Sequence, residues 1–489
     1  MSARKRRTPS LWRSETVIGL ITPAFLVLAL VLGGASREAI LPNLILQMIA
    51  VLAMAAALLS AGRLDPRSLP PLLLALGVLA LAGPLLGALQ LIPLPAALWT
   101  QFPGRDSVAA GFGLLGLPLP ALPLSLTPSA TLLAMAGFLP PLAVLVLGLT
   151  LGFSAFSQAL RWGVVLMACG ACLFGLVQAF LGWGGGLYLY ESTNIGWPVG
   201  FFSNVNHQAS LMLMAAPFLA AAASRVRFGW AVGDRDLGLA AIVGAAALLL
   251  TVGVIAAGSE FGYWMLGPVV GVSFLVYRGK EITWRHGVAA LALGLGLFGA
   301  GLALWHSPLL AMLGLERPEG MFTSDEPRKL IFATTWEAIT SYWPLGSGFG
   351  SFEEAYRAFE DPQTVDNTFV NMAHNEYLQT LMEFGALGAV LLVAGVGWWI
   401  AASVHVWSAS DLEDVRLRRA ASVALGVLFV HSIVDYPGRT AAIACLAMAC
   451  AVLMAAPARS AASRSESSRN RTATAASDPD QPAGTALDL

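Results

Sequence analysis

Five short polar segments carry most of the residues that could do chemistry in this sequence. Histidine can take a proton from a hydroxyl near neutral pH, arginine can bind diphosphate oxygens in a bidentate manner, and Asn, Glu and Tyr side chains can orient sugar hydroxyls. No nucleotide-binding, redox or nucleophile motif is visible, so an activated substrate must bring its own leaving group. A lipid-linked diphosphate sugar meets that condition. The segments are Ser203–His207, Ser259–Gly262, Arg328, His374–Tyr377, and the pair His431 and Asp435.

Four of the five segments also have a purely structural interpretation. Ser203 or Asn204 can simply cap a helix, and Glu260 can be solvated in a turn. His431 and Asp435 are four residues apart, so a self-satisfied surface pair is as well supported as a functional one. Arg328 can be an ordinary residue in the first turn of a helix. The functional interpretation therefore depends on the segments coming together.

The elements that must position these segments are membrane helices. The 489 residues are 57% hydrophobic and 12% charged, with a mean hydropathy of +0.71, whereas soluble domains carry about 25% charged residues. A formal net charge of −1 gives no basic field of the kind that nucleic-acid binding requires. Four cysteines within apolar stretches predict neither a disulfide framework nor a metal site. We expect an all-α polytopic transmembrane helical bundle with no nucleic-acid partner.

Hydropathy predicts twelve spans, because apolar runs of about 20 residues can cross a bilayer as helices. The apolar stretch 108–126 is interrupted by three prolines and is predicted to be a re-entrant or surface segment instead. The spans are predicted at residues 17–33, 40–61, 70–92, 131–151, 160–181, 208–223, 236–257, 262–277, 286–305, 378–404, 417–434 and 437–456.

The positions of the charges predict the orientation. With both termini cytoplasmic, most of the 28 Lys and Arg residues fall on the inner side, as the positive-inside rule expects. All five polar segments then fall on the outer side, although they were not used to choose the topology. The outer side holds few cations, which are Arg37, Arg105, Arg317, Arg328, Lys329, Arg357 and Arg439.

One large outer loop, residues 306–375, is predicted to form a small helical cap. Asp325-Glu326-Pro327 begins a helix that Trp343-Pro344 ends, and Ser351 with Glu354 reads as a capping box for a second helix that stops at Asp361-Pro362. Gly346–Gly350 looks like a phosphate loop, but no strand precedes it, which favours a flexible turn.

The predicted organisation has four parts. They are a basic cytoplasmic N-terminus at 1–16, an amino-terminal transmembrane region at 17–200, a second transmembrane domain at 201–456 that includes the loop 306–375, and a disordered cytoplasmic tail at 457–489.

Several stretches of the chain form a recognisable series. The main ones are Phe201–Ala209, Pro344–Phe352, Ala373–Gln379, Glu383–Gly388 and His431–Pro437, and two upstream ones are Leu89–Pro95 and Pro123–Pro128. Together the main stretches resemble the O-antigen ligase and polymerase family of bacterial membrane glycosyltransferases. The resemblance covers about residues 201–454, and the two upstream stretches resemble family members that act on exopolysaccharide.

The resemblance implies a multi-pass inner-membrane enzyme, all-helical and glycosyltransferase C-like, with its active site facing the periplasm and with no metal or other cofactor. The implied donor is an undecaprenyl-diphosphate-linked oligosaccharide, and the acceptor is a hydroxyl of a glycan or of the lipid A core. The bilayer, a flippase and a chain-length regulator are the other implied partners. By motif position, His374 activates the acceptor and Arg328 holds the diphosphate. The implied substrate-binding residues are Asn204, Asn206, His207, Glu260, Asn375, Glu376 and Tyr377, supported by His431 and Asp435.

One departure from the family pattern concerns the turn after the seventh span. Many members have Ser-Arg-Gly there, and this chain has Ser259-Glu260-Phe261-Gly262. Three explanations stay open. Arg328, Lys329 or Arg439 supplies the positive charge, or Glu260 contacts the acceptor, or the activity differs.

The resemblance of the amino-terminal half to exopolysaccharide members favours a repeat-unit polymerase. A ligase that uses the lipid A core and a protein O-oligosaccharyltransferase are alternatives within the family. A solute transporter is the alternative from another class, since twelve spans with both ends inside is a common transporter plan. Transporters, however, usually have repeated halves and polar sites at the membrane midplane, and neither is visible in the sequence.

Overall fold

The structure is a computed structural model of the whole chain. It describes residues 15–35, 40–61, 69–150, 153–182, 186–226, 234–279, 282–305, 307, 325–363, 365, 369–409 and 414–456. The predicted tail at 457–489, most of the basic segment 1–16 and the first part of the large loop lie outside the described residues. The described part is mostly helical, with one two-stranded sheet.

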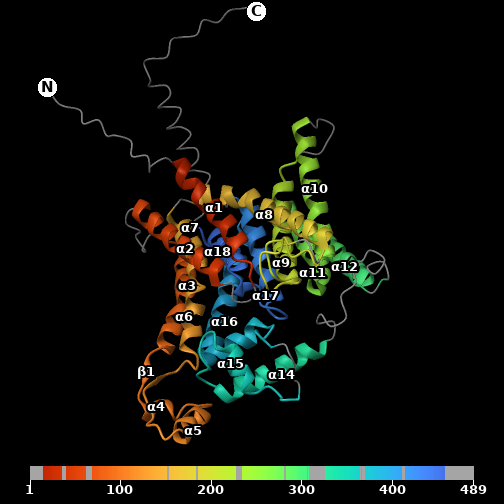
Figure 1. Cartoon of the computed structure of the whole chain (residues 1–489). Helices are drawn as coiled ribbons and strands as arrows, with labels where there is room; N and C mark the ends of the chain where they lie inside the picture. The colour runs from red at the N-terminus through yellow and green to blue at the C-terminus, as the bar shows by residue number, and fades with distance from the viewer. Residues whose placement is uncertain are drawn as a thin grey trace, which may run out of the picture.

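A helix lies at each of the predicted spans (Figure 1), and the fourth span is divided into α6 and α7. Among the described residues, seven helices are long and apolar enough to cross a membrane. α9, α11 and α17 are not among the seven. The bundle helices are α1 (Glu15–Leu32), α2 (Ile40–Ala61), α3 (Pro71–Gln90), α6 (Pro128–Ala136), α7 (Leu139–Thr150), α8 (Phe153–Leu181), α9 (Val205–Ala223), α10 (Asp234–Ala256), α11 (Glu260–Arg278), α12 (Trp284–Trp305), α16 (Glu376–Ser408), α17 (Val415–His431) and α18 (Ala441–Ala455).

Helix α9 forms the centre of the bundle and is buried on nearly all sides. It packs against α8, α10, α11 and α17. Glycines bring neighbouring helices into close contact, because a Cβ at Gly267 or Gly271 of α11 would collide with the backbone of α12, as is common where membrane helices pack. Large apolar side chains of α2, α3 and α12, such as Leu59, Val78 and Leu291, stay exposed on the outside of the bundle. An exposed apolar exterior suits a protein surrounded by lipid.

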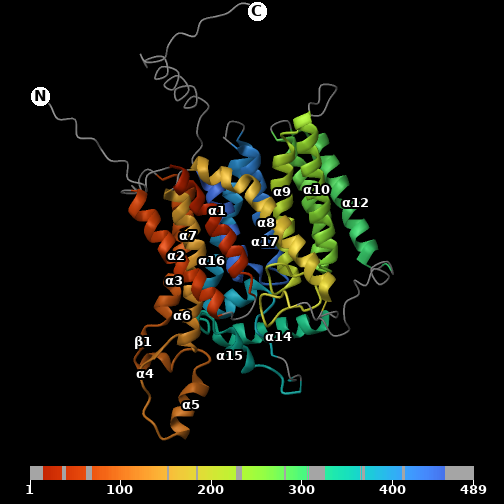
Figure 2. The same cartoon turned by 45° about the horizontal axis from the view of Figure 1, so that its top comes forward.

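Two short helices lie across one end of the bundle, below α9 and α16 in Figure 2. These are α14 (Asp325–Tyr342) and α15 (Phe352–Arg357), and Ile339, Tyr342, Phe352 and Tyr356 form their shared apolar core with Met382 of α16. The predicted helix between Asp325 and Trp343 is confirmed. The capping box is wrong, because the Ser351 hydroxyl donates to the Gly348 carbonyl instead of capping α15. α15 also ends at Arg357, before the predicted stop.

A projecting hairpin lies at the same end of the molecule (Figures 1 and 2). It comprises β1 (Pro93–Leu94), α4 (Ala96–Trp99), α5 (Asp106–Leu114) and β2 (Leu122–Pro123), and the two strands pair antiparallel with Pro93 opposite Pro123. The Pro-rich stretch is therefore a surface segment and not a further span. The strands bring together the two upstream stretches 89–95 and 123–128.

Candidate functional site

A cavity of about 310 Å³ lies where α9, α11, α14, α16 and α17 meet. Five separate parts of the chain contribute to its wall, and each contains one of the predicted polar segments. The predicted site residues on the wall are Asn204, Asn206, Glu260, Arg328, His374 and His431. The convergence on which the functional interpretation depends is therefore present.

The alternating directions of the helices explain this convergence. α9, α11 and α16 begin at this end of the bundle, whereas α10 and α17 end there. Each of the three starting helices has a polar N-cap, since Asn204 accepts from the Asn206 amide, Ser259 from the Gly262 amide and Asn375 from the Leu378 amide. The capping interpretation of Asn204 is confirmed, and Asn204 also lines the cavity. Three helix N-termini near one cavity favour an anionic ligand.

Asp435 lies behind the cavity and is the centre of its polar contacts. It is fully buried, and its Oδ2 accepts from Nδ2 of Asn206 at 2.8 Å. Its Oδ1 is 3.4 Å from Nδ1 of His374 and 3.9 Å from Nε2 of His207, and its Oδ2 is 3.9 Å from Nε2 of His431. The alternative of a surface pair at His431 and Asp435 is wrong, because both side chains are buried and shared with α9 and the segment before α16.

The charge state of Asp435 follows from these neighbours. Burial alone raises the pKa of a carboxyl group, but interaction with His207 and His374 outweighs burial and holds the pKa of Asp435 well below its usual value. Asp435 is therefore a carboxylate at physiological pH, and it can stabilise an imidazolium that forms on a neighbouring histidine.

Two of the histidines on the wall are held in defined positions. His374 has a left-handed backbone, with φ of 49°, which is uncommon for a residue other than glycine. His431 has its Nδ1 2.5 Å from Oγ of Ser210, and the ring of Phe261 stacks on it with centroids 3.8 Å apart. The two imidazoles are thus fixed by backbone, hydrogen bond and stacking.

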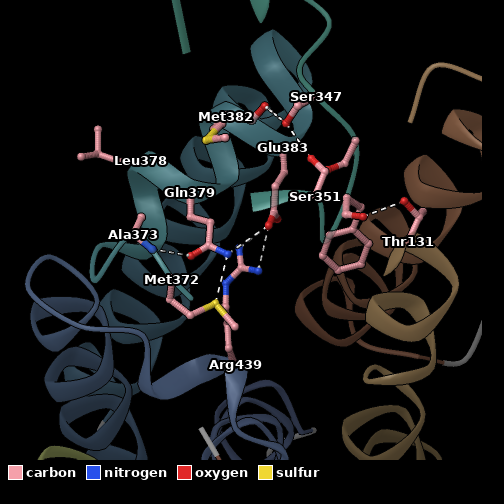
Figure 3. A network of polar contacts seen from close by, with 12 residues as sticks. Thr131, Ser347, Ser351, Met372, Ala373, Leu378, Gln379, Met382, Glu383 and Arg439 are labelled. Carbon is pink, nitrogen blue, oxygen red and sulfur yellow. Dashed lines mark hydrogen bonds and ion pairs between the residues drawn. The ribbon is translucent and has the colours of Figure 1, made fainter. Parts of the chain in front are cut away.

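The cations on the wall both come from α14. Within the described residues, no carboxylate lies within ion-pair distance of Arg328 or Lys329. Arg439, the third candidate for the missing positive charge, is different. Its guanidinium contacts both carboxylate oxygens of the buried Glu383, at 3.0 and 3.2 Å, and Gln379 donates to the same carboxylate (Figure 3). Arg439 is already paired with Glu383, so Arg328 and Lys329 are the cations at the cavity.

The other predicted site residues lie off the cavity wall. Tyr377 donates its hydroxyl to the carbonyl of Phe429 at 2.7 Å, and Glu376 accepts from the Gly438 amide at 2.7 Å. Asn375 caps α16, and His207 lies buried with its ring edge-to-face against Tyr436. These contacts connect α9, α16, α17 and the segment after α17.

The glycine-rich stretch Gly346–Gly350 is a packed turn. Its amides are used within the protein, since Ser347 donates to Met382, Gly348 to Glu383 and Phe349 to the side chain of Gln90. A phosphate loop needs those amides for its ligand, so that interpretation is wrong, and the turn is not an open, flexible one either.

The sequence interpretation missed the aromatic part of the wall. Trp197, Phe261, Trp264 and Phe332 line the cavity beside Asn194. Trp264 follows Glu260 by one helical turn, and this spacing was the signal that could have revealed it. Trp197 lies in the irregular segment before α9, where no periodicity indicates which side chains point inward.

A family comparison covers the middle of the site. Residues 245–393 match the model of the O-antigen ligase family. This stretch contains Glu260, Arg328 and His374, and it supports the predicted resemblance to the O-antigen ligase and polymerase family. Members of the family are glycosyltransferase-like enzymes, and the apolar helices agree with a multi-pass membrane protein. No curated protein matches the chain.

Proposed function

We propose that the protein transfers a glycan from an undecaprenyl diphosphate carrier to an acceptor hydroxyl on the periplasmic side of the inner membrane. The observation that carries the proposal is the cavity in which Arg328 and Lys329 lie together with His374. Two cations in a cavity that also borders the N-termini of α9 and α16 suit the two phosphates of the carrier. A histidine beside a buried carboxylate suits the removal of a proton from a hydroxyl.

The chemistry follows from this arrangement. The acceptor oxygen forms a bond to the anomeric carbon, and the bond from that carbon to the carrier diphosphate breaks. The diphosphate leaves with the electron pair, stabilised by Arg328 and Lys329. Nδ1 of His374 faces Asp435 at 3.4 Å, so we assign Nε2 to take the acceptor proton, and the Asp435 carboxylate balances the positive charge on the ring.

Within this reaction we favour a repeat-unit polymerase, in which the acceptor is the end sugar of another glycan. The hairpin that pairs residues 93–94 with 122–123 brings together the two stretches, 89–95 and 123–128, that resemble exopolysaccharide members. A ligase that uses the lipid A core is the alternative within the same mechanism. A flippase and a chain-length regulator are the partners that a polymerase needs.

The test replaces Arg328 in cells that lack the native gene. Arg328→Ala is expected to abolish the glycan product while the protein still inserts in the membrane, and Arg328→Lys is expected to restore part of the product, because lysine keeps the charge but loses the bidentate geometry. Arg357→Ala is the matched control, since Arg357 pairs with Glu353 on the exposed side of α15. Normal product from Arg328→Ala contradicts the proposal.

The size of the product decides between the two acceptors. A polymerase gives a ladder of repeat units that collapses to single units in the variant. A ligase leaves the ladder on its carrier and loses only the transfer to the lipid A core.

A further inference from the structure

Glu260 and Trp264 form a second part of the cavity that differs from the cationic part. They are the first and fifth residues of α11 and lie on the same face of the helix, one turn apart. Both line the cavity, and Trp264 is 42% exposed. Phe261, between them in sequence, also lines the cavity and stacks on His431.

The carboxylate of Glu260 lies in the first turn of α11, where it suits the helix dipole but does not cap the helix. Ser259 already caps α11 by accepting from the Gly262 amide. Among the residues that the structure describes, no Lys, Arg or His lies within ion-pair distance of Glu260. The carboxylate therefore lies on the cavity wall without an ion-pair partner in the part of the chain that the structure describes.

A second tryptophan completes this part of the wall. Trp197 is 8% exposed and lies against Gly258, whose φ is 60° and where an added Cβ would come within 2.7 Å of the indole ring. The turn that carries Ser259 and Glu260 is thus packed directly on Trp197. An indole held this rigidly presents its apolar surface at little cost in conformational entropy.

The charged residues of the cavity come from different elements. Arg328 and Lys329 come from α14, whereas Glu260, Trp264 and Trp197 come from α11 and the segment before α9. A diphosphate is repelled by a carboxylate, so Glu260 does not suit the phosphates. A carboxylate accepts hydroxyl protons in strong, charge-assisted hydrogen bonds, and an indole covers the apolar face of a sugar ring.

We propose that Glu260, Trp264 and Trp197 form a subsite for an uncharged, hydroxyl-rich sugar ring, next to the cationic part on α14. The inference depends on the proposed glycan transfer. The ring belongs either to the acceptor or to the donor, and the kinetics below distinguish them. Many members of the family that the sequence resembles have an arginine in this turn. The subsite gives a function to Glu260, the negative residue that this chain has instead.

The test uses the purified protein in lipid nanodiscs. Its substrate is the lipid-linked glycan fraction from cells that lack the gene, and a second series adds the same glycan, released from its lipid, as acceptor. Trp264→Ala and Glu260→Ala are expected to raise KM about 10-fold or more, and Glu260→Gln to raise it less because an amide oxygen still accepts a hydrogen bond. A rise for the released glycan assigns the ring to the acceptor, and a rise for the lipid-linked glycan alone assigns it to the donor.

Inhibition by inorganic pyrophosphate reports on the cationic part separately. It is expected to stay within about twofold of wild type in Trp264→Ala and to weaken strongly in Arg328→Ala. Glu260→Arg is expected to lose product because the sugar hydroxyls lose their acceptor. Trp336→Ala and Glu337→Gln, both exposed on α14 and outside the cavity, are the matched controls.

Three results overturn the inference. They are an unchanged KM in both Trp264→Ala and Glu260→Ala, weaker pyrophosphate inhibition in Trp264→Ala, and normal or increased product from Glu260→Arg. If these occur while Arg328→Ala still abolishes transfer, the subsite is wrong and the proposed function stands. If Arg328→Ala also transfers normally, the proposed function itself fails.

Discussion

Two buried arginines at one end of the helical bundle and a buried carboxylate at the other end differ in how their neighbours bond them. At the end away from the cavity, Arg418 and Arg419 are buried and donate to backbone carbonyls where other helices finish. Arg419 alone reaches Gly279 after α11, and Val406, Trp407 and Ala409 near the end of α16, while Arg418 reaches Ala456 after α18. These carbonyls are the ones that a helix leaves without internal partners, and a cation there also suits the helix dipole.

At the cavity end, the polar groups are close but incompletely bonded. Asp435 accepts two short hydrogen bonds, from Asn206 and from the Tyr436 amide, and has three histidines between 3.4 and 3.9 Å. Both ring nitrogens of His207 are buried without a hydrogen bond within the described residues. Buried polar groups without full partners cost stability. We infer that the arginines at one end stabilise the bundle, whereas the charged groups at the other end remain available to a substrate.

The largest effect is expected from the stabilising end. Arg419→Met keeps an apolar stem but leaves buried carbonyls at two helix ends without donors, which is expected to cost roughly 3 kcal/mol of unfolding free energy. Thermal unfolding in nanodiscs measures it. Arg357→Ala, which breaks an exposed pair on α15, is the control and should cost less than about 1 kcal/mol. An Arg419→Met protein as stable as wild type contradicts the comparison.

The second prediction compares two buried carboxylates, Asp435 and Glu383. Asp435→Asn keeps the shape of the side chain and is expected to lower the transfer rate about 10- to 100-fold with little change in Tm, because the charge that balances His374 is lost. Glu383→Gln also removes a buried carboxylate, but one that pairs with Arg439 away from the cavity. It should lower Tm more than the rate. The reverse pattern would show that Asp435 is the structural residue of the two.

The smallest effect concerns Tyr377, which is predicted from the family pattern to bind glycan. Its hydroxyl donates to Phe429 between α16 and α17, so Tyr377→Phe is expected to cost about 1 kcal/mol of stability and to leave the transfer rate unchanged. Measuring Tm and rate on the same preparation checks this. A large loss of transfer rate at an unchanged Tm would show that Tyr377 binds glycan.

The sequence was sufficient to predict the helices and the end of the bundle where the site lies. A membrane helix is a long apolar run, so hydropathy predicts it without any periodic pattern in the sequence. Successive helices cross the membrane in opposite directions, which places every second connection on the same side. That reasoning alone predicts that His374, Arg328 and Asn206 lie at the same end of the bundle. In the structure, Asn206 and His374 both face the carboxylate of Asp435.

The direction of individual side chains could not be predicted in this way. Residues 374–377 are consecutive, and successive residues around a helix start point in different directions, so His374 faces the cavity while Tyr377 faces α17. Asp435 and His431 also fit a local pair equally well in the sequence. Only the tertiary packing shows that Asn206 and His374 share the carboxylate of Asp435.

The central claim is that His374 activates the acceptor in a cavity that the rest of the bundle holds in place. The most direct measurement is the rate of glycan transfer by purified His374→Ala in nanodiscs, on the lipid-linked glycan fraction from cells that lack the gene, with Tyr377→Phe beside it. Loss of a general base lowers rates by a factor of about 100 to 10,000. We predict a loss of this size for His374→Ala, with Tm close to that of wild type, and a normal rate for Tyr377→Phe. A His374→Ala protein that transfers glycan at the wild-type rate would contradict the account.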